Sequence, residues 1–251
     1  MRPGVWRNVA SGLASISLLF VAVVSTAEAP AVANQGEHAG AVIATLSNLK
    51  TLSHWAYPQE PAAVYLYPSA HSRVIDHLHL LTVDGQAEVY LALRAYTVGG
   101  STWISVSIPE RPNGMTGWVP ASVLGELHMS REDLRVNSAT LRATLFRDGR
   151  EIWSAPIGIG RPGLLTPRGH FYVTEKLTAL GAPFYGPYAI GTSAYAPTLT
   201  EWPGGGVIGI HGTDEPQLIP GHPSHGCIRL RNDDITRLWP LIQVGTPIEI
   251  L

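Results

Sequence analysis

Short runs of β-branched and aromatic residues, separated by turn-forming residues, recur along most of this chain. Clear examples cover residues 64–67, 88–93 and 103–108, and each has the length of a single strand. The 251 residues include 26 glycines and 20 prolines, enough to interrupt any long helix. No heptad or sustained helical periodicity competes with this pattern. We therefore expect a mainly β fold.

The composition favours a folded domain that does not bind nucleic acid. Hydrophobic residues make up 45% of the chain and charged residues 14%, a balance that buries a core and argues against disorder. The formal net charge is −2, and lysine and arginine form no cluster. We therefore expect no nucleic-acid partner. The length suits one large domain or two small ones.

The N-terminal residues have the order of a secretory signal peptide. Arg2 and Arg7 precede an apolar run over residues 12–24, which gives way to small residues. Residues 31–33, Ala-Val-Ala, fit the cleavage motif, and another candidate site lies just upstream, so we expect a signal peptide over residues 1–33. The alternative is an uncleaved anchor, although a membrane span needs roughly 20 apolar residues. With either a signal peptide or an anchor, we expect the rest of the chain to be exported and membrane contact to be limited to this segment.

The first half of the remaining chain predicts a small barrel. Residues 34–50 are rich in alanine and small polar residues, which is typical of a linker. The closely spaced β-prone runs that follow favour a barrel. Residues 117–124, Gly-Trp-Val-Pro-Ala-Ser-Val-Leu, resemble the end of bacterial SH3-like domains. That resemblance implies an SH3-like barrel over residues 51–127, and the alternative is an unrelated β-rich spacer.

The second half is also β-rich and contains one clear hairpin. Asp148-Gly149 lies between β-prone runs at residues 141–146 and 151–157, which is the strongest short hairpin signal. Three further strands are expected, at residues 170–174, 207–211 and 247–251. A turn with the sequence Thr-Pro-Arg-Gly, starting at Thr166, precedes the first of them.

One short helix is expected near the C-terminus. Asn232 suits the N-cap position, and Asp233 and Asp234 suit the first turn, where negative charge is favourable. The apolar residues that follow share one helical face. Pro240 then limits the helix, because proline cannot continue it.

The chain holds a single cysteine, Cys227. Exported domains usually pair their cysteines in disulfides, so a lone thiol is a candidate reactive group. A buried structural cysteine and an intermolecular disulfide are the alternatives. Two segments favour the reactive thiol because they concentrate histidine and glycine: His-Gly-Thr at residues 211–213 and Ser-His-Gly-Cys-Ile-Arg-Leu at residues 224–230.

These residue types suit nucleophilic catalysis. A free cysteine has a pKa of about 8.5, so a histidine close in space is needed to take its proton near neutral pH. Gly226 lets the backbone approach a substrate, and N–H groups in such a turn stabilise an oxyanion.

Strand alternation would bring the polar groups to one side of the sheet. In an extended segment, Cys227, Arg229 and Arg231 share one face, and the apolar residues between them point to the core. On the earlier segment, Gly209 and His211 share a face in the same way.

A metal site is the alternative interpretation of this cluster. His211, His222, His225 and Cys227 are all possible zinc ligands. Their spacing is uncommon for zinc and no second cysteine exists, so we expect neither a metal nor another cofactor. His222 is then a loop residue.

Two roles stay open. Arg229 is either an ion-pair partner for a nearby acid or a substrate contact. The aromatic residues before the strand at 207–211 either line a substrate cleft or lid or simply pack: Tyr185, Tyr188, Tyr195 and Trp202.

The two histidine-containing segments resemble a known signature. His-Gly-Thr at residues 211–213, followed by Ser-His-Gly-Cys-Ile-Arg-Leu-x-Asn at residues 224–232, is similar to the motif of YkuD-type L,D-transpeptidase catalytic domains. The hairpin and the Thr-Pro-Arg-Gly turn support this more weakly. The resemblance implies a β-rich catalytic domain with one or two short helices over residues 130–251.

The resemblance also implies roles for individual residues. Cys227 is the expected nucleophile and His211 its base, oriented by the Gly212 carbonyl. His225 and Gly226 are expected to form the oxyanion turn with Cys227. Three further residues are expected to be substrate-orienting or structural: Ser224, Arg229 and Asn232.

The implied activity is acyl transfer on peptidoglycan stem peptides in the periplasm or cell wall. Cys227 would form a thioester with loss of D-alanine, and an amine from a neighbouring stem would complete a cross-link. Water as the acceptor would instead give a carboxypeptidase, and a non-catalytic wall-binding protein is the remaining alternative. β-Lactams of the carbapenem type are the expected covalent inhibitors.

Overall fold

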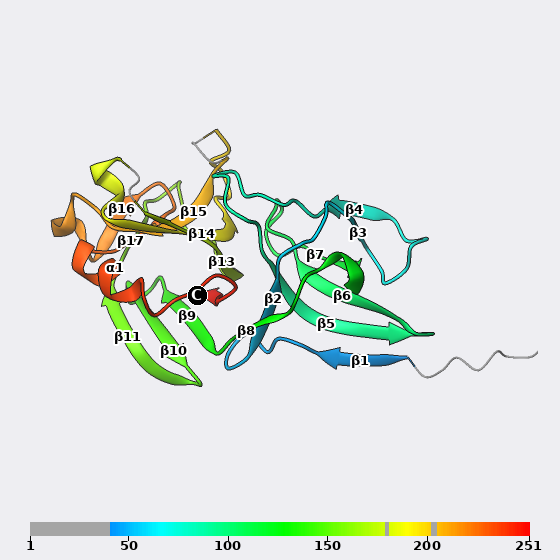
Figure 1. Ribbon diagram of the computed structural model, residues 1–251. Coiled ribbons are helices and arrows are strands. Elements are labelled where there is room, and N and C mark those ends of the chain that lie inside the picture. The colour runs from blue at the N-terminus through cyan, green and yellow to red at the C-terminus, as the bar shows by residue number, and fades with distance from the viewer. Residues whose placement is uncertain (1–40, 179–180, 202–204) are drawn as a thin grey trace, which may run out of the picture. The chain divides into compact units, whose positions relative to one another are not determined.

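The computed structural model describes residues 41–178, 181–201 and 205–251, which lie in one compact unit (Figure 1). The expected mainly β fold is confirmed, because nearly all regular structure is strand. The expected signal peptide and residues 34–40 of the expected linker lie outside the described residues. The rest of the expected linker was wrongly predicted in part, because residues 42–45 form a strand of the first sheet. Within the described part of the chain, no helix is long and apolar enough to cross a bilayer.

The first sheet contains eight strands, all paired antiparallel (Figure 1, blue to green). In sheet order they are β4 (Val74–His77), β3 (Ala63–Tyr65), β7 (Thr116–Pro120), β6 (Ser101–Ser107), β5 (Tyr90–Val98), β2 (Ser53–Ala56) and β8 (His128–Ser130), with β1 (Val42–Thr45) pairing β5. The β-prone runs of the first half thus form strands β3, β5, β6 and β7. The short 3-10 helix η1 (Ala121–Val123) follows β7. Assignment of this sheet as SH3-like stays a prediction.

The second sheet contains ten strands and carries the cysteine segment. In sheet order they are β11 (Arg150–Pro156), β10 (Arg142–Arg147), β9 (Glu132–Asn137), β18 (Pro247–Ile250), β13 (Gly169–Thr178), β14 (Tyr188–Tyr195), β15 (Val207–His211), β17 (Ile228–Arg229), β12 (Gly158–Gly160) and β16 (Gly221–Ser224). Two 3-10 turns flank its strands: η2 (Pro183–Tyr185) and η3 (Pro216–Leu218). A single large apolar cluster, which includes Ile210 and Ile228, forms the core of this half.

The expected hairpin is confirmed. β10 and β11 pair antiparallel with Arg147 opposite Arg150. Asp148 and Gly149 connect them with φ of 50° and 74°, so both central residues are left-handed. That is the conformation that a two-residue hairpin turn requires, and Asp-Gly adopts it readily.

The short helix α1 (Asn232–Leu238) is present where it was expected, but its start was wrongly predicted. The N-cap residue is Arg231, without a side-chain capping bond, and Asn232 is the first helical residue. The Asn232 side chain is unavailable to the helix because its Oδ1 accepts the N–H of Thr213 at 2.9 Å. Asp233 and Asp234 occupy the first turn as predicted.

The two sheets contact each other through Tyr172 of β13. This side chain is fully buried and packs with Trp55, Val89 and Leu91 of the first half. Its hydroxyl donates to the Val89 carbonyl at 3.0 Å. A buried phenol needs such a partner, so this bond allows the aromatic ring to fill the junction.

Candidate active site

A small pocket of about 50 Å³ lies where β15 and β17 run side by side. Cys227 and His211 both line it. Its apolar wall is made by Phe184, Ala196, Leu199, Gly206, Val207 and Ile208, and its polar wall by Tyr185, Ser224, His225 and Arg229. Thus the structure brings five of the expected site residues into one pocket.

Parallel pairing places Cys227 beside a glycine. Ile210 pairs with Ile228 and His211 with Arg229, so the residue before β17 lies opposite Gly209. The Gly209 N–H donates to the Cys227 sulfur at 3.4 Å. His211 is two residues further along β15 and therefore lies on the same face of the strand as Gly209.

His211 is held in one orientation by its neighbour. The side chain is only 4% exposed, and its Nδ1 lies 2.6 Å from the Gly212 carbonyl oxygen. A carbonyl can only accept, so Nδ1 carries the proton and donates it, which leaves Nε2 as the basic nitrogen. The Tyr185 ring meets the imidazole edge-on, with centroids 4.9 Å apart. Burial lowers the pKa of His211 to about 4, so the ring is neutral at pH 7.

The thiol is also neutral at rest. Burial raises the pKa of Cys227 above its ordinary value, and this outweighs the Gly209 N–H and the positive charge of Arg229. A neutral thiol beside a neutral imidazole suits general-base catalysis, in which the proton moves as the sulfur attacks.

Two hydroxyl groups hold the turn that carries Cys227. Ser224 Oγ donates to the Cys227 carbonyl at 2.6 Å and accepts the Gly226 N–H at 3.1 Å. Thr166 Oγ1 donates to the Gly226 carbonyl at 2.6 Å and accepts the Gly160 N–H at 3.0 Å. Sequence reasoning did not single out Thr166 for the site. The Thr-Pro-Arg-Gly turn was the sequence feature that could have pointed to Thr166. The carbonyl that its hydroxyl reaches could not be predicted, because it depends on how distant segments fold together.

Asn232 organises the other side of the site. Its Oδ1 bonds the Thr213 N–H, which ties the start of α1 to the chain directly after His211 and Gly212. The oxygen lies so close to Gly212 that a Cβ there would approach it to 2.3 Å. Asn232 therefore does not line the pocket, but it contacts Gly212, whose carbonyl orients His211.

His225 and Arg229 occupy the polar wall. Arg161 Nη2 donates to His225 Nε2 at 2.9 Å, so that nitrogen is already engaged. The Arg229 side chain is 15% exposed and pairs with Glu215 at 3.0 Å, which establishes the expected ion pair. Its Nε is buried without a hydrogen-bond partner among the described residues.

Some residues of the histidine-rich region lie away from the pocket. Arg231 does not share the face of Cys227, because β17 ends at Arg229 and the Arg231 guanidinium donates to the Ile219 carbonyl. His222 is exposed and does not line the pocket. Within the described ranges, no group of three or more His, Cys, Asp or Glu side chains could hold a metal.

The aromatic residues divide between the two expected roles. Tyr185 lines the pocket, whereas Tyr188 stacks on Trp239 with centroids 4.5 Å apart. Tyr195 lies under the Arg111 guanidinium. Trp202 lies outside the described residues.

Comparison with known proteins agrees with this arrangement. The family model of the L,D-transpeptidase catalytic domain, YkuD, matches residues 131–250. The L,D-transpeptidase YqjB of Bacillus subtilis, a provisional name, is 32% identical over 123 residues, which cover 46% of this chain and 68% of that protein. The chain belongs to the YkuD family of L,D-transpeptidases.

Other members of the family cover different shares of the chain. YkuD of Bacillus licheniformis is 33% identical over 115 residues, 46% of this chain and 61% of its own length. YcfS of Escherichia coli is 29% identical over 212 residues, 73% of this chain and 65% of its own length. Both names are provisional. The chain thus spans about three fifths of the first of these relatives, and the transpeptidase match concerns mainly its second half.

The resting state of this transpeptidase-family thiol can be tested by alkylation. We expect iodoacetamide to modify Cys227 slowly near pH 6 to 7 and faster as the pH rises past about 9, because burial raises the thiol pKa above its usual value of about 8.5. Rates would be measured by mass spectrometry, with Cys227→Ser as the unreactive control. A rate that is already maximal near pH 6 would contradict the neutral pair and indicate a preformed thiolate.

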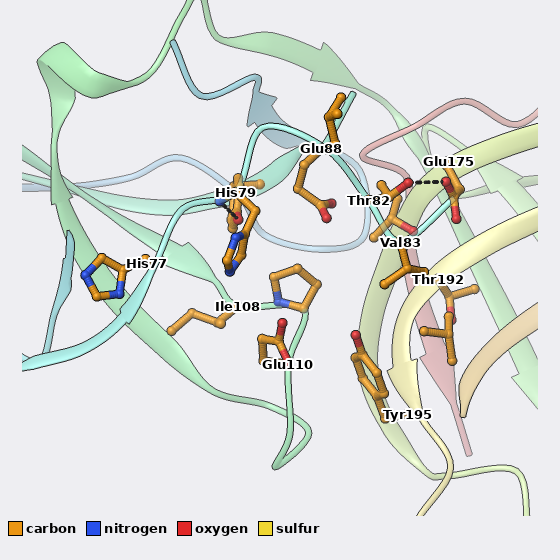
Figure 2. Close-up of a pocket in the computed structure, with 15 residues that line it drawn as sticks. His77, His79, Thr82, Val83, Glu88, Ile108, Glu110, Glu175, Thr192 and Tyr195 are labelled. Carbon is orange, nitrogen blue, oxygen red and sulfur yellow. Dashed lines mark hydrogen bonds between the residues drawn. The ribbon is translucent and has the colours of Figure 1, made fainter. Parts of the chain in front are cut away.

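A second, larger cavity of about 220 Å³ lies between the two sheets of this family member, apart from Cys227 (Figure 2). Three carboxylates line it: Glu88, Glu110 and Glu175. Glu175 accepts a bond from Thr82 Oγ1 at 2.6 Å. Glu88 is 8% exposed, and burial, together with the charges of Glu175 and Glu110, raises its pKa from 4.5 to about 7 despite a bond from the Val89 N–H.

This raised pKa predicts a pH-dependent stability. A carboxyl group whose folded pKa lies above its unfolded pKa stabilises the fold below about pH 4.5, and that contribution is lost as the pH rises through about 7. We expect Glu88→Gln to raise the free energy of unfolding at about pH 8 by at most about 3 kcal/mol, and to raise the melting temperature with it. At about pH 4.5 the variant and the wild type should have nearly the same melting temperature. Calorimetry at the two pH values would measure this. An equal change in melting temperature at the two pH values would contradict the raised pKa of Glu88.

Proposed function

We propose that this chain is an exported enzyme that cross-links peptidoglycan stem peptides through a thioester on Cys227. The observation that carries the proposal is a pocket lined by both the half-buried thiol of Cys227 and a buried, neutral imidazole whose Nδ1 is anchored on the Gly212 carbonyl. Nucleophile, base and orienting group are the three parts that thiol acyl transfer requires. Family membership supports the same reaction class.

The first half-reaction forms the thioester. The sulfur of Cys227 attacks the carbonyl of the peptide bond before a terminal D-alanine, and its proton passes to His211 Nε2. The Gly226 N–H already donates to Ser224, so the N–H of Cys227 is the donor we assign to the oxyanion. When the tetrahedral intermediate collapses, the C–N bond breaks and His211 gives its proton to the leaving amine.

The second half-reaction releases the product. The free amine of a neighbouring stem peptide attacks the thioester carbonyl and loses a proton to His211. The C–S bond then breaks, and the sulfur recovers this proton as the thiol of Cys227. Arg229 lines the pocket, and its positive charge is suited to a substrate carboxylate. No cofactor enters either step.

Export and wall attachment belong to the same proposal. Residues 1–33 would direct the chain out of the cytoplasm. The first sheet, which includes the predicted SH3-like module of residues 51–127, would act on the wall beside the catalytic domain of residues 130–251. Carbapenems would acylate Cys227 because their strained amide presents the same type of carbonyl to the thiol.

Mass spectrometry tests the proposal. Incubation with a carbapenem should add one drug mass at Cys227, and Cys227→Ala should remain unmodified. Purified tetrapeptide muropeptides should then release D-alanine and give dimers joined through third-position residues. Monomeric tripeptides as the sole product would indicate a carboxypeptidase instead. A chain that forms no adduct and releases no D-alanine would refute the enzymatic function.

A further inference from the structure

One wall of the catalytic pocket is a connection rather than a strand. Residues 195–201 and 205–207, here called the wall segment, join β14 to β15. Ala196, Leu199, Gly206 and Val207 of this segment line the pocket. Within the segment, the Ala196 N–H donates to the Gly206 carbonyl at 2.8 Å. Several of its other carbonyls are bonded from the first sheet.

Arg111, in the turn between β6 and β7 of the first sheet, bonds three of these carbonyls. Its Nη1 donates to Gly205 O at 2.7 Å, and its Nη2 donates to Ala196 O at 3.1 Å and Leu199 O at 3.0 Å. The guanidinium carbon also lies 4.5 Å from the centroid of the Tyr195 ring. A planar guanidinium can bond several acceptors at once while stacking on an aromatic ring, which an ammonium cannot do equally well.

Asn113 of the same turn holds the start of the wall segment. Its Nδ2 donates to Tyr195 O at 2.8 Å, and its Oδ1 accepts the Tyr195 N–H at 2.9 Å. The side-chain amide therefore pairs with both backbone groups of Tyr195, as a neighbouring strand would. Unpaired, these groups would cost free energy in a partly buried position.

The wall segment also packs tightly on Arg111. A Cβ at Gly206 would approach Leu199 O to 2.0 Å and Arg111 Nη2 to 2.7 Å, and the residue has φ of 82°. Only glycine fits there. The path of this pocket-lining backbone is thus determined jointly by the second sheet and by a side chain of the first.

We infer that Arg111 and Asn113 are positioning residues for substrate binding at Cys227. They hold the wall segment in place, so that the first sheet forms part of the catalytic unit in addition to any role in wall attachment. This inference rests on the proposed function, because the pocket is taken to bind the acyl donor. Cys227 and His211 themselves are held by other groups, namely the Gly209 N–H, the Gly212 carbonyl and the Ser224 hydroxyl.

Acylation kinetics of the full chain test the inference. For Arg111→Ala, we expect the carbapenem concentration at half-maximal rate to rise about tenfold, while the limiting rate changes less than about threefold, since binding surface is lost but the reacting groups stay in place. Asn113→Ala should act in the same direction. Arg111→Lys should recover part of the loss, because lysine can still donate to one or two of the carbonyls. Arg150→Ala, an exposed arginine on β11, is the matched control.

Hydrogen exchange gives a readout that does not depend on activity. In Arg111→Ala and Asn113→Ala, amides of residues 195–199 should exchange faster, whereas amides of β10 and β18 should keep the wild-type rate. If the wild-type chain is not acylated, the proposed function fails, and the exchange result still decides whether these residues hold the wall segment. If Arg111→Ala has the acylation kinetics of the wild type and the same amide exchange rates in the wall segment, the inference is overturned. Should Arg111→Ala not fold, Arg111→Lys and Asn113→Ala decide the same question.

Discussion

Replacing His211 with alanine is expected to slow acylation of Cys227 by about 10² to 10⁴-fold, the range that a general base contributes. Without the imidazole, the thiol has no adjacent group to take its proton, and burial keeps its pKa above the ordinary value. The residual rate should approach that of Cys227→Ala. Stopped-flow measurement with a carbapenem would give the rates, and His222→Ala, outside the pocket, is the matched control.

The same experiment separates the two histidines that line the pocket with the thiol. His225→Lys should retain acylation within about tenfold of the wild type, since Arg161 already donates to His225 Nε2 and we assign the base to His211. A reversed pattern, with an active His211→Ala and an inactive His225→Lys, would assign the base to His225 and refute our mechanism.

Replacing Ser224 with alanine is expected to have the second largest effect. The side chain is 1% exposed, and its hydroxyl bonds both the Cys227 carbonyl and the Gly226 N–H. Its loss leaves two buried backbone groups unpaired, at a cost of about 1 to 3 kcal/mol each at most. We expect acylation to fall by about 10 to 100-fold, because the N–H that holds the oxyanion is carried by the same turn.

A remote hydroxyl provides the control for this variant. Ser154 of β11 bonds Thr144 at 3.3 Å in the hairpin, far along the sheet order from β17. Ser154→Ala should lower the melting temperature slightly and leave acylation unchanged. If Ser224→Ala lost stability but kept the wild-type acylation rate, the Ser224 hydroxyl would be structural only, and the turn would not need it for catalysis.

Features governed by neighbouring residues were predictable from the amino-acid order. Asp148-Gly149 dictates a left-handed turn through backbone sterics alone, so the β10–β11 hairpin followed directly. Strands β6 and β15 were visible as β-prone runs between glycines and prolines. Cys227 and His211 were identified for a similar reason, because the motif around each is short and the residue types in it have specific chemistry.

Features that depend on contacts between distant segments were not predictable in this way. Asn232 has the side chain of an N-cap, yet the N–H of Thr213 is its partner, and this bond exists only because the start of α1 lies beside the chain that follows β15. Arg231 has the correct parity to share the face of Cys227, but β17 ends too early for strand alternation to reach it. At both positions, contacts with segments distant in sequence outweighed the conformation that the neighbouring residues favour.

The order of residues along this chain was sufficient for its strand content, its Asp148-Gly149 hairpin turn and the identity of its thiol and imidazole, because each depends on a few adjacent residues. The neutral state of that pair, the bonds from Ser224 and Thr166 to the cysteine turn, and the hold of Arg111 on the wall segment arose only on folding. Burial and hydrogen bonding act between groups that are close in space, and here those groups are separated by up to 94 residues in sequence.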